Sequence, residues 1–275
     1  MSTLKVGGIR GISASSDAIT VNASDGTCTA NITNNLSNRN LIINGAMQVS
    51  QRNGSSSVDL DAPNTDAWVA DRWHFYNYGS GELDADIQRI DNDAPAGFKY
   101  AAKLTVTTPE SSGGTPASAD RFSLQYRFEG SDLDRLDLGK ATAKAFYISF
   151  WVKSSLTGNF GLVVTGATTA LQYPVLYPIS SANTWEKKTI KIPGPTSGSW
   201  VSNTGGAMHI KFGLYTGSSY SAANQGITGT GSWISGSNAQ GTTGQVQLGA
   251  TNGATWLMTG FQMEISDTAT DFEHR

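Results

Sequence analysis

The stretch from Trp256 to Ile265 constrains the fold of this chain more than any other. Its residues alternate for ten positions. Those at even numbers point to one side of the predicted strand, and those at odd numbers point to the other: Leu257, Thr259, Phe261, Met263 and Ile265. A period of two is typical of a β-strand, and this one has a largely apolar face. A single sheet cannot bury its own apolar face, so the sequence predicts a second sheet packed against the first.

A second strong stretch, residues 40–49, reads Asn-Leu-Ile-Ile-Asn-Gly-Ala-Met-Gln-Val. We expect it to form a strand that pairs with residues 256–265. That pairing would bring together the ends of one domain, residues 40–275, and would leave residues 1–39 outside it.

Further alternating stretches follow at short intervals, separated by turns rich in Pro, Gly and Ser: 72–78, 103–107, 122–128, 145–152, 160–164, 187–192 and 209–215. This spacing is typical of an all-β, antiparallel β-sandwich of jelly-roll type. Residues 131–138 are the helical candidate, with Ser131 as the cap and Leu133 and Leu136 facing inward.

Residues 1–39 contain short β-prone pieces at 4–9, 18–21 and 28–32. Pieces this short do not make a stable sheet alone, and such segments find partners in another chain or in identical copies. The sequence therefore favours an attachment or oligomerisation segment, and a flexible tail is the alternative.

The composition of the chain excludes several classes of partner and site. Charged residues make up 15% of the chain and the net charge is −3, so nucleic acid is not an expected partner. Cys28 is the only cysteine, which excludes an intramolecular disulfide and a cysteine-based metal site. The N-terminus lacks a signal-peptide core and no apolar run approaches a membrane span, so we expect synthesis in a cytosol and no membrane insertion.

Several motifs carry a resemblance to a known group of proteins. Residues 257–264 and 269–275 resemble the ending of jelly-roll modules in phage tail-fibre and virion-appendage proteins, and matching motifs occur earlier, at 40–45, 48–51, 70–73, 148–153 and 184–187. The resemblance covers 40–275, with Met263 and Asp271 replacing the usual Leu and Pro. The opening of the chain also resembles the attachment segments of marine-phage fibre proteins.

This resemblance implies a structural virion protein, assembled in the host cytoplasm, whose residues 1–39 bind other virion proteins. It implies a tail-fibre or receptor-binding appendage that contacts a host-surface glycan, and fibre analogy implies a homotrimer. The alternative role is a capsid-decorating head fibre or cement protein. A third alternative, a glycan depolymerase, is not expected.

The candidate glycan-binding residues lie in polar loops. An indole in a loop offers a flat apolar face to a sugar ring, and neighbouring amides and hydroxyls supply hydrogen bonds. The candidates are Trp200, Tyr220, Asn224, Gln225, Trp233 and Asn238. The alternative is that the loop tryptophans fold back and plug an end of the sandwich. The tryptophans at 73, 151, 185 and 256 lie in alternating strands and are expected in the core.

The acidic residues allow a catalytic and a metal-binding interpretation. They cluster at 59–71 and 84–93, but Asp fills turns for its own hydrogen-bonding reasons, and the sequence has neither HExxH nor GxSxG. No enzyme activity and no obligatory cofactor are expected. Glu264, with Asn44 nearby, could hold a structural calcium ion. An ion pair of Glu264 with Arg52 or Arg72 is the preferred alternative.

Overall fold

The computed structural model describes residues 7–10, 12, 19–26, 28–30, 39–60, 65–79, 83–110, 115–220, 231–236, 239–266 and 268–275. The chain divides into two compact units, Met1–Asn38 and Arg39–Arg275.

The first unit contains three short antiparallel strands, β1 (Gly8–Ile9), β2 (Ile19–Val21) and β3 (Cys28–Ala30), in the order β1-β2-β3. The strands are two or three residues long. A sheet of such short strands buries little apolar surface of its own. Its role in attachment stays a prediction.

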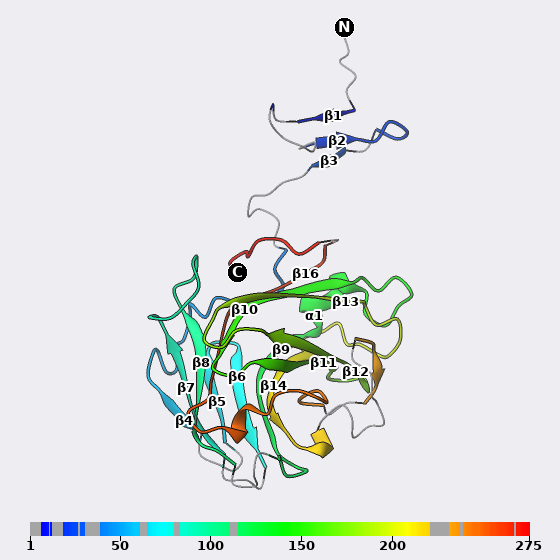
Figure 1. The fold of residues 1–275 in the computed structure, drawn as a ribbon. Coiled ribbons are helices and arrows are strands. Elements are labelled where there is room, and N and C mark those ends of the chain that lie inside the picture. The colour runs from blue at the N-terminus through cyan, green and yellow to red at the C-terminus, as the bar shows by residue number, and fades with distance from the viewer. Residues whose placement is uncertain are drawn as a thin grey trace. The chain divides into compact units, whose positions relative to one another are not determined.

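The second unit consists of two antiparallel sheets that face each other (Figure 1). The six-stranded sheet has the order β13-β10-β16-β8-β7-β4, and the seven-stranded sheet has the order β15-β12-β11-β14-β9-β6-β5. The strands are β4 (Val58–Leu60), β5 (Thr65–Ala70), β6 (Trp73–Tyr78), β7 (Asp84–Ile90), β8 (Ala101–Thr108), β9 (Arg121–Glu129), β10 (Phe146–Ser154), β11 (Gly158–Gly166), β12 (Leu171–Ile179), β13 (Glu186–Ile192), β14 (Gly206–Thr216), β15 (Ile234–Ser235) and β16 (Thr255–Glu264).

The connections follow a jelly-roll pattern. From β8 to β11 each strand lies in the opposite sheet from the one before it, and the chain crosses again between β12, β13 and β14. The last strand, β16, lies between β10 and β8, which come much earlier in the chain. The predicted fold class, an antiparallel β-sandwich of jelly-roll type, is confirmed.

The core between the sheets is aromatic. Phe150 and Phe212 meet edge to face with centroids 5.1 Å apart, and Phe212 lies 5.3 Å from Trp256. Apolar burial contributes about 25 cal/mol per Å², so these large rings dominate the stability of the sandwich. Of the four tryptophans expected in the core, two are fully buried, Trp73 and Trp256. The other two, Trp151 and Trp185, are half-buried.

Strand β16 is present as predicted, but its two faces are not. Trp256 and Met258 join the main core, and so do Phe261 and Met263. The alternation therefore changes phase near Gly260, where φ is +61° and the pairing with β10 shifts register. A β-bulge of this kind reorients the side chains that follow it. Leu257, which precedes the bulge, lies outside the main core with Ile90 and Ala101, whereas Phe261 and Met263, which follow it, lie in the main core.

Residues 40–49 lie beside β16 but do not form the predicted strand. The Leu41 N–H donates to the Met263 carbonyl (2.8 Å), and the Phe261 N–H donates to the Gly45 carbonyl (3.0 Å). Between these two bonds the chain turns, and the Asn44 side chain donates to the carbonyls of Val49 and Asp71. Asparagine side chains that bond to nearby backbone compete with a regular strand ladder.

The other differences are local. Strands β4, β5, β7, β12 and the two-residue β15 were not predicted. Acidic residues in β4, β5 and β7 and the two prolines of β12 obscure the alternation of those strands. The helical segment is α1 (Gly130–Leu133) followed by η1 (Asp134–Leu136), with Glu129 rather than Ser131 at the N-cap. Leu133 and Leu136 are buried as predicted. In the described part of the chain, helices long and apolar enough to cross a membrane are absent.

Candidate binding site

The outer face of the seven-stranded sheet gathers polar side chains from distant parts of the chain. On β9 the core residues Phe122, Leu124 and Tyr126 alternate with outward-facing ones, and β14 alternates in the same way. The register places His209 opposite Arg127, Lys211 opposite Gln125, and Gly213 opposite Ser123. Directly opposed residues have Cβ atoms about 5 Å apart, so these side chains form one surface.

This surface contains a groove of about 360 Å³. Small-molecule sites occupy about 300–1,000 Å³ and combine apolar walls with a few converging polar groups. The lining residues come from β6, β9, β11, β14 and the loop before residue 245: Tyr76, Gln125, Arg127, Thr165, Gly166, Ala167, His209, Lys211 and Gln240. We refer to this site as the sheet groove.

The loop of residues 239–245 forms one wall of the sheet groove and lies directly on the sheet. A Cβ on Gly213 would come within 2.5 Å of Gly241 Cα and 2.6 Å of the Gln240 carbonyl oxygen, so the close approach requires glycine. The Gln240 side-chain oxygen accepts hydrogen bonds from Gln125 Nε2 (2.9 Å) and Ser123 Oγ (3.3 Å). The wall is therefore tied to the strands beneath it.

Aromatic rings lie at another side of the sheet groove. The Tyr76 ring lines it and stacks on Tyr78 with centroids 4.0 Å apart. The Arg121 guanidinium lies 5.1 Å from the Tyr78 ring centroid and 4.1 Å from that of Tyr220. The Tyr220 carbonyl accepts from the Gln240 N–H (2.8 Å), so this predicted residue lies next to the groove wall.

The electrostatics of the sheet groove are unusual because the ammonium of Lys211 is buried close to other basic side chains. Burial and, to a smaller extent, the charges of Arg127 and Arg121 together lower the pKa of Lys211 to about 7. Burial also lowers the pKa of His209 to about 4, with contributions from Lys211 and Arg127, so this imidazole is neutral near pH 7. Lys211 Nζ donates to the Ala239 carbonyl (3.2 Å).

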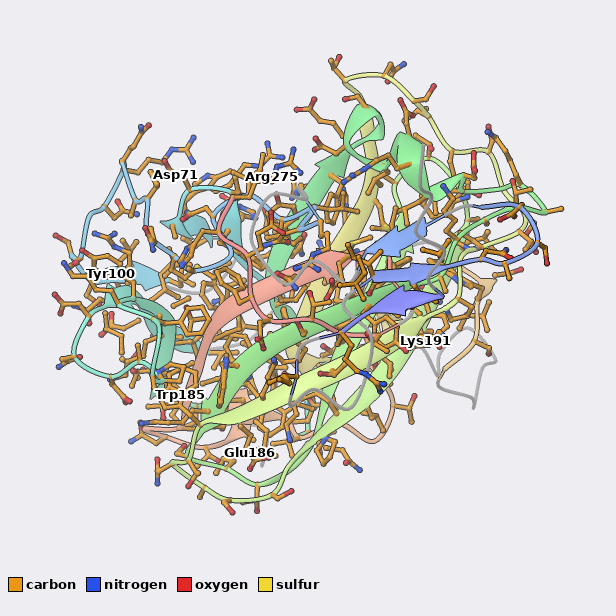
Figure 2. All side chains as sticks on the ribbon, turned by 90° about the horizontal axis from the view of Figure 1, so that it is seen from above. Asp71, Tyr100, Trp185, Glu186, Lys191 and Arg275 are labelled. Carbon is orange, nitrogen blue, oxygen red and sulfur yellow. The ribbon has the colours of Figure 1, made fainter. Side chains whose placement is uncertain are left out.

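A second hollow, of about 470 Å³, lies at the end of the sandwich where Figure 2 labels Asp71 and Arg275. It is larger than the sheet groove, but its polar side chains bond to one another or to nearby backbone. Asn44 is held by Val49 and Asp71, and Gln48 bonds to His274 (3.3 Å). In the sheet groove Gln125 and Gln240 also bond to each other, but among the described residues the Arg127 and His209 side chains make no hydrogen bond or ion pair, so the sheet groove is the better candidate.

The two loop tryptophans lie together, away from Tyr220. Trp200 and Trp233 are half-buried, with ring centroids 6.0 Å apart, and both pack against the main core. The Trp200 indole N–H donates to the Ser197 carbonyl (3.1 Å), and that of Trp233 donates to the Pro193 carbonyl (2.5 Å). This packing resembles the alternative in which the indoles plug the sandwich. Asn224, Gln225 and Asn238 lie outside the described residues, and glycan binding by all six residues stays a prediction.

Glu264 is fully buried. We expected it to form an ion pair with Arg52 or Arg72, and it does not. Its Oε1 accepts from the Thr270 N–H (2.8 Å) and Gln262 Nε2 (3.0 Å), and its Oε2 accepts from Thr270 Oγ1 (2.7 Å). Arg72 instead pairs with Asp132 (3.5 Å), and the Arg52 guanidinium lies 4.4 Å from the Trp68 ring centroid. These partners are donors rather than further oxygen ligands, so the geometry gives calcium no support, and that site stays a prediction.

The acidic residues of 59–71 and 84–93 serve local structure where they are described. Asp66 lies 2.8 Å from His74 Nε2, and Asp71 accepts from the Gln51 N–H. Asp93 accepts from Lys153 Nζ and from the Trp185 indole (3.1 Å). Among the described residues, groups of three or more His, Cys, Asp or Glu side chains that could hold a metal are absent.

Sequence reasoning missed the sheet groove, although a signal was present. Alternation on 122–128 and 209–215 predicts an outward polar face, with Gln125 and Arg127 on one strand and His209 and Lys211 on the other. Nothing in the sequence says that these strands are neighbours.

Neither a family model nor a curated protein matches the sequence. Solved structures give low-scoring likenesses. The enzymatically active domain of tailspike protein 4 from bacteriophage CBA120 has a TM-score of 0.39 at 10% identity, over 82% of this chain and 21% of that one, so this chain spans about a fifth of its length. The module TmCBM61 in complex with β-1,4-galactotriose has a TM-score of 0.35 at 10% identity (70% and 88% covered). A family 11 carbohydrate-binding module of a Clostridium thermocellum cellulase has a TM-score of 0.32 at 12% identity (77% and 97%). Likenesses at this level assign neither a site nor an activity to this chain.

Proposed function

We propose that this chain is a structural virion protein of a bacteriophage, a tail-fibre or receptor-binding appendage, and that its sandwich binds a host-surface glycan in the sheet groove. One observation carries the glycan assignment. The Tyr76 ring lines the same groove as Gln125, Thr165 and Gln240, and amides and hydroxyls are the groups that form hydrogen bonds with sugar hydroxyls. The phage assignment rests on the sequence resemblance.

Binding rather than hydrolysis is favoured by the groove lining. Glycoside hydrolysis commonly uses two carboxyl groups that flank the scissile bond. Among the described residues, Asp and Glu are absent from the lining of the sheet groove. We therefore expect incubation with the ligand polysaccharide to leave its chain length unchanged, which size-exclusion chromatography measures.

Titration calorimetry of the full chain against a panel of bacterial surface polysaccharides tests the binding role. Tyr76→Ala should weaken binding about tenfold, on the order of 1.4 kcal/mol, because the stacking face is lost. Tyr147→Ala is the matched control, since Tyr147 is a half-buried tyrosine on the outer face of the other sheet. If both variants bind like the wild type, the glycan does not use the sheet groove.

The same measurement tests the predicted loop residues. If Trp200→Ala or Trp233→Ala loses stability but keeps its affinity, the two indoles are packing residues. If either variant loses affinity while keeping its melting temperature, the loops contribute to the site as the sequence predicted.

Position in the particle is tested by a cryo-electron microscopy map of the intact virion. Density for this chain on the tail supports host recognition. Density on the capsid shell, with residues 1–39 between capsomers, supports the alternative role in capsid decoration. Sedimentation of the intact chain tests the proposed homotrimer, and a monomer would contradict it.

A further inference from the structure

Lys211 is the most deeply buried ammonium for which the structure gives a hydrogen bond, and its partner is an uncharged carbonyl. Two other shielded lysines, Lys153 and Lys188, each lie 2.5 Å from a carboxylate oxygen. Lys211 is only 4% exposed and donates to the Ala239 carbonyl. A buried charge is costly unless an opposite charge compensates it, so this arrangement needs an explanation.

The surroundings of Lys211 add to the cost. Arg127 lies on the neighbouring strand opposite His209, two residues from Lys211, and its charge lowers the pKa of both. In the described part of the chain, the groove lining contains Arg127, His209 and Lys211 but not one carboxylate. The positive charge of the sheet groove therefore has no compensating partner in its own walls.

We infer that the sheet groove binds a saccharide bearing an anionic substituent, a carboxylate or a sulfate, which lies between the Arg127 guanidinium and the Lys211 ammonium. The inference rests on the proposed glycan binding and specifies the class of glycan. An anion there would supply the charge that the groove walls lack.

The geometry suits such a ligand. Arg127 is exposed, and a planar guanidinium can pair with two oxygens of one anionic group. Lys211 lies deeper, where a charge-assisted hydrogen bond is least screened by solvent. Tyr76 and Gln125 line the same groove and are available to the sugar ring that carries the substituent.

Binding of the anionic ligand should depend on pH. The titratable and charged groups around Lys211 come from three strands: His209 on β14, Arg121 and Arg127 on β9, and His74 and Tyr76 on β6. Near pH 7 Lys211 changes protonation state, whereas the arginines stay charged and His209 stays neutral. Affinity should therefore rise as the pH falls from 8 to 6, and the complex should take up a proton.

The test uses matched pairs of polysaccharides with the full-length chain. Polygalacturonate, alginate, hyaluronan and polysialic acid are each compared with their carboxyl-reduced forms, a sulfated galactan is compared with its desulfated form, and neutral galactan, glucan and mannan complete the panel. We expect at least one acidic polymer to bind at least tenfold more tightly than its neutral partner. Arg127→Gln should remove most of that preference, and Arg135→Gln, an exposed arginine of η1, should keep it.

Each outcome decides between the two proposals. Equal affinity for acidic and neutral partners, or binding of neutral polymers alone, overturns the anionic specificity and leaves glycan binding intact. Binding to no polymer of the panel overturns the glycan proposal and this inference with it. A preference for acid that Arg127→Gln leaves unchanged places the anion outside the sheet groove and overturns the inference. A preference seen only with the carboxylated polymers identifies a carboxylate ligand. A preference seen only with the sulfated polymer identifies a sulfate ligand.

Discussion

The outer faces of the two sheets each bury a charged side chain, but the two side chains differ in the number of hydrogen bonds that the fold provides. On the six-stranded sheet, Glu264 of β16 is fully buried and accepts three hydrogen bonds from Thr270 and Gln262. On the seven-stranded sheet, Lys211 of β14 is almost as buried but has a single carbonyl acceptor. Both strands are central in their sheets. One face satisfies its charge internally, and the other leaves it to be satisfied from outside.

We call the outer face of the six-stranded sheet the closed face and that of the seven-stranded sheet the open face. The closed face is also covered by other segments of the chain. Phe98 lies where a Cβ on Gly260 would be, and its ring meets Phe272 of the C-terminal segment with centroids 5.0 Å apart. Thr259 Oγ1 donates to the Tyr100 carbonyl (2.6 Å). Figure 2 labels Tyr100 and Trp185 on the side of the six-stranded sheet. The outer face of the six-stranded sheet therefore stabilises the fold, whereas that of the seven-stranded sheet keeps polar groups in a groove, as a binding surface requires.

The largest effect should come from breaking the closed face at Glu264. Glu264→Leu leaves the Thr270 N–H and the Gln262 amide without their buried acceptor, which should cost about 3 kcal/mol of unfolding free energy. Urea denaturation at pH 7 measures it. Glu264→Gln keeps one acceptor oxygen and should lose less. A Leu variant as stable as the wild type would show that this carboxylate does not hold the C-terminal segment.

A smaller effect is expected where the loop lies on the open face. Gly213→Ala places a methyl group against Gly241 and Gln240, so the loop of residues 239–245 must move, at about 2 kcal/mol. Gly206→Ala on the same strand is the control, because its Cβ would meet only Ala167 at 3.9 Å. Thermal unfolding and glycan titration are measured together. Unchanged affinity in a destabilised Gly213→Ala would mean that the loop wall does not contribute to binding.

The smallest effect has the opposite sign. Lys211 has a pKa of about 7 in the folded chain and an ordinary value of 10.5, so burying its charge destabilises the fold fully below pH 7. Between pH 7 and pH 10.5 the unfolded chain binds more protons than the folded chain, so this destabilisation decreases as the pH rises. Lys211→Met should therefore stabilise the fold by about 1–2 kcal/mol at pH 6, discounted for relaxation, and much less at pH 10.

Chemical denaturation at the two pH values tests this, with Lys187→Met, an exposed lysine of β13, as the control. The Lys211→Met variant should also lose affinity for an acidic polysaccharide. A variant that is less stable than the wild type at pH 6 would mean that Lys211 is compensated within the fold, which would remove the contrast with Glu264.

The all-β class, the outward polar positions and strands β6, β8, β9, β10, β11, β13, β14 and β16 could be predicted from the sequence. Alternation between Phe122 and Phe128, or between His209 and Tyr215, depends only on the two-residue period of a strand, and so it can be read locally. The helical turn with Leu133 and Leu136 inward could be read in the same way.

The bulge at Gly260, the turn at Asn44 and the sheet groove could not be predicted from the sequence. The bulge and the turn depend on hydrogen bonds between segments more than 100 residues apart, such as Leu41 with Met263. The groove depends on which strands are neighbours, because β6, β9, β14 and the 239–245 loop each supply one part of it. Periodicity fixes the direction in which a side chain points, but only the pairing of distant strands fixes what lies beside it.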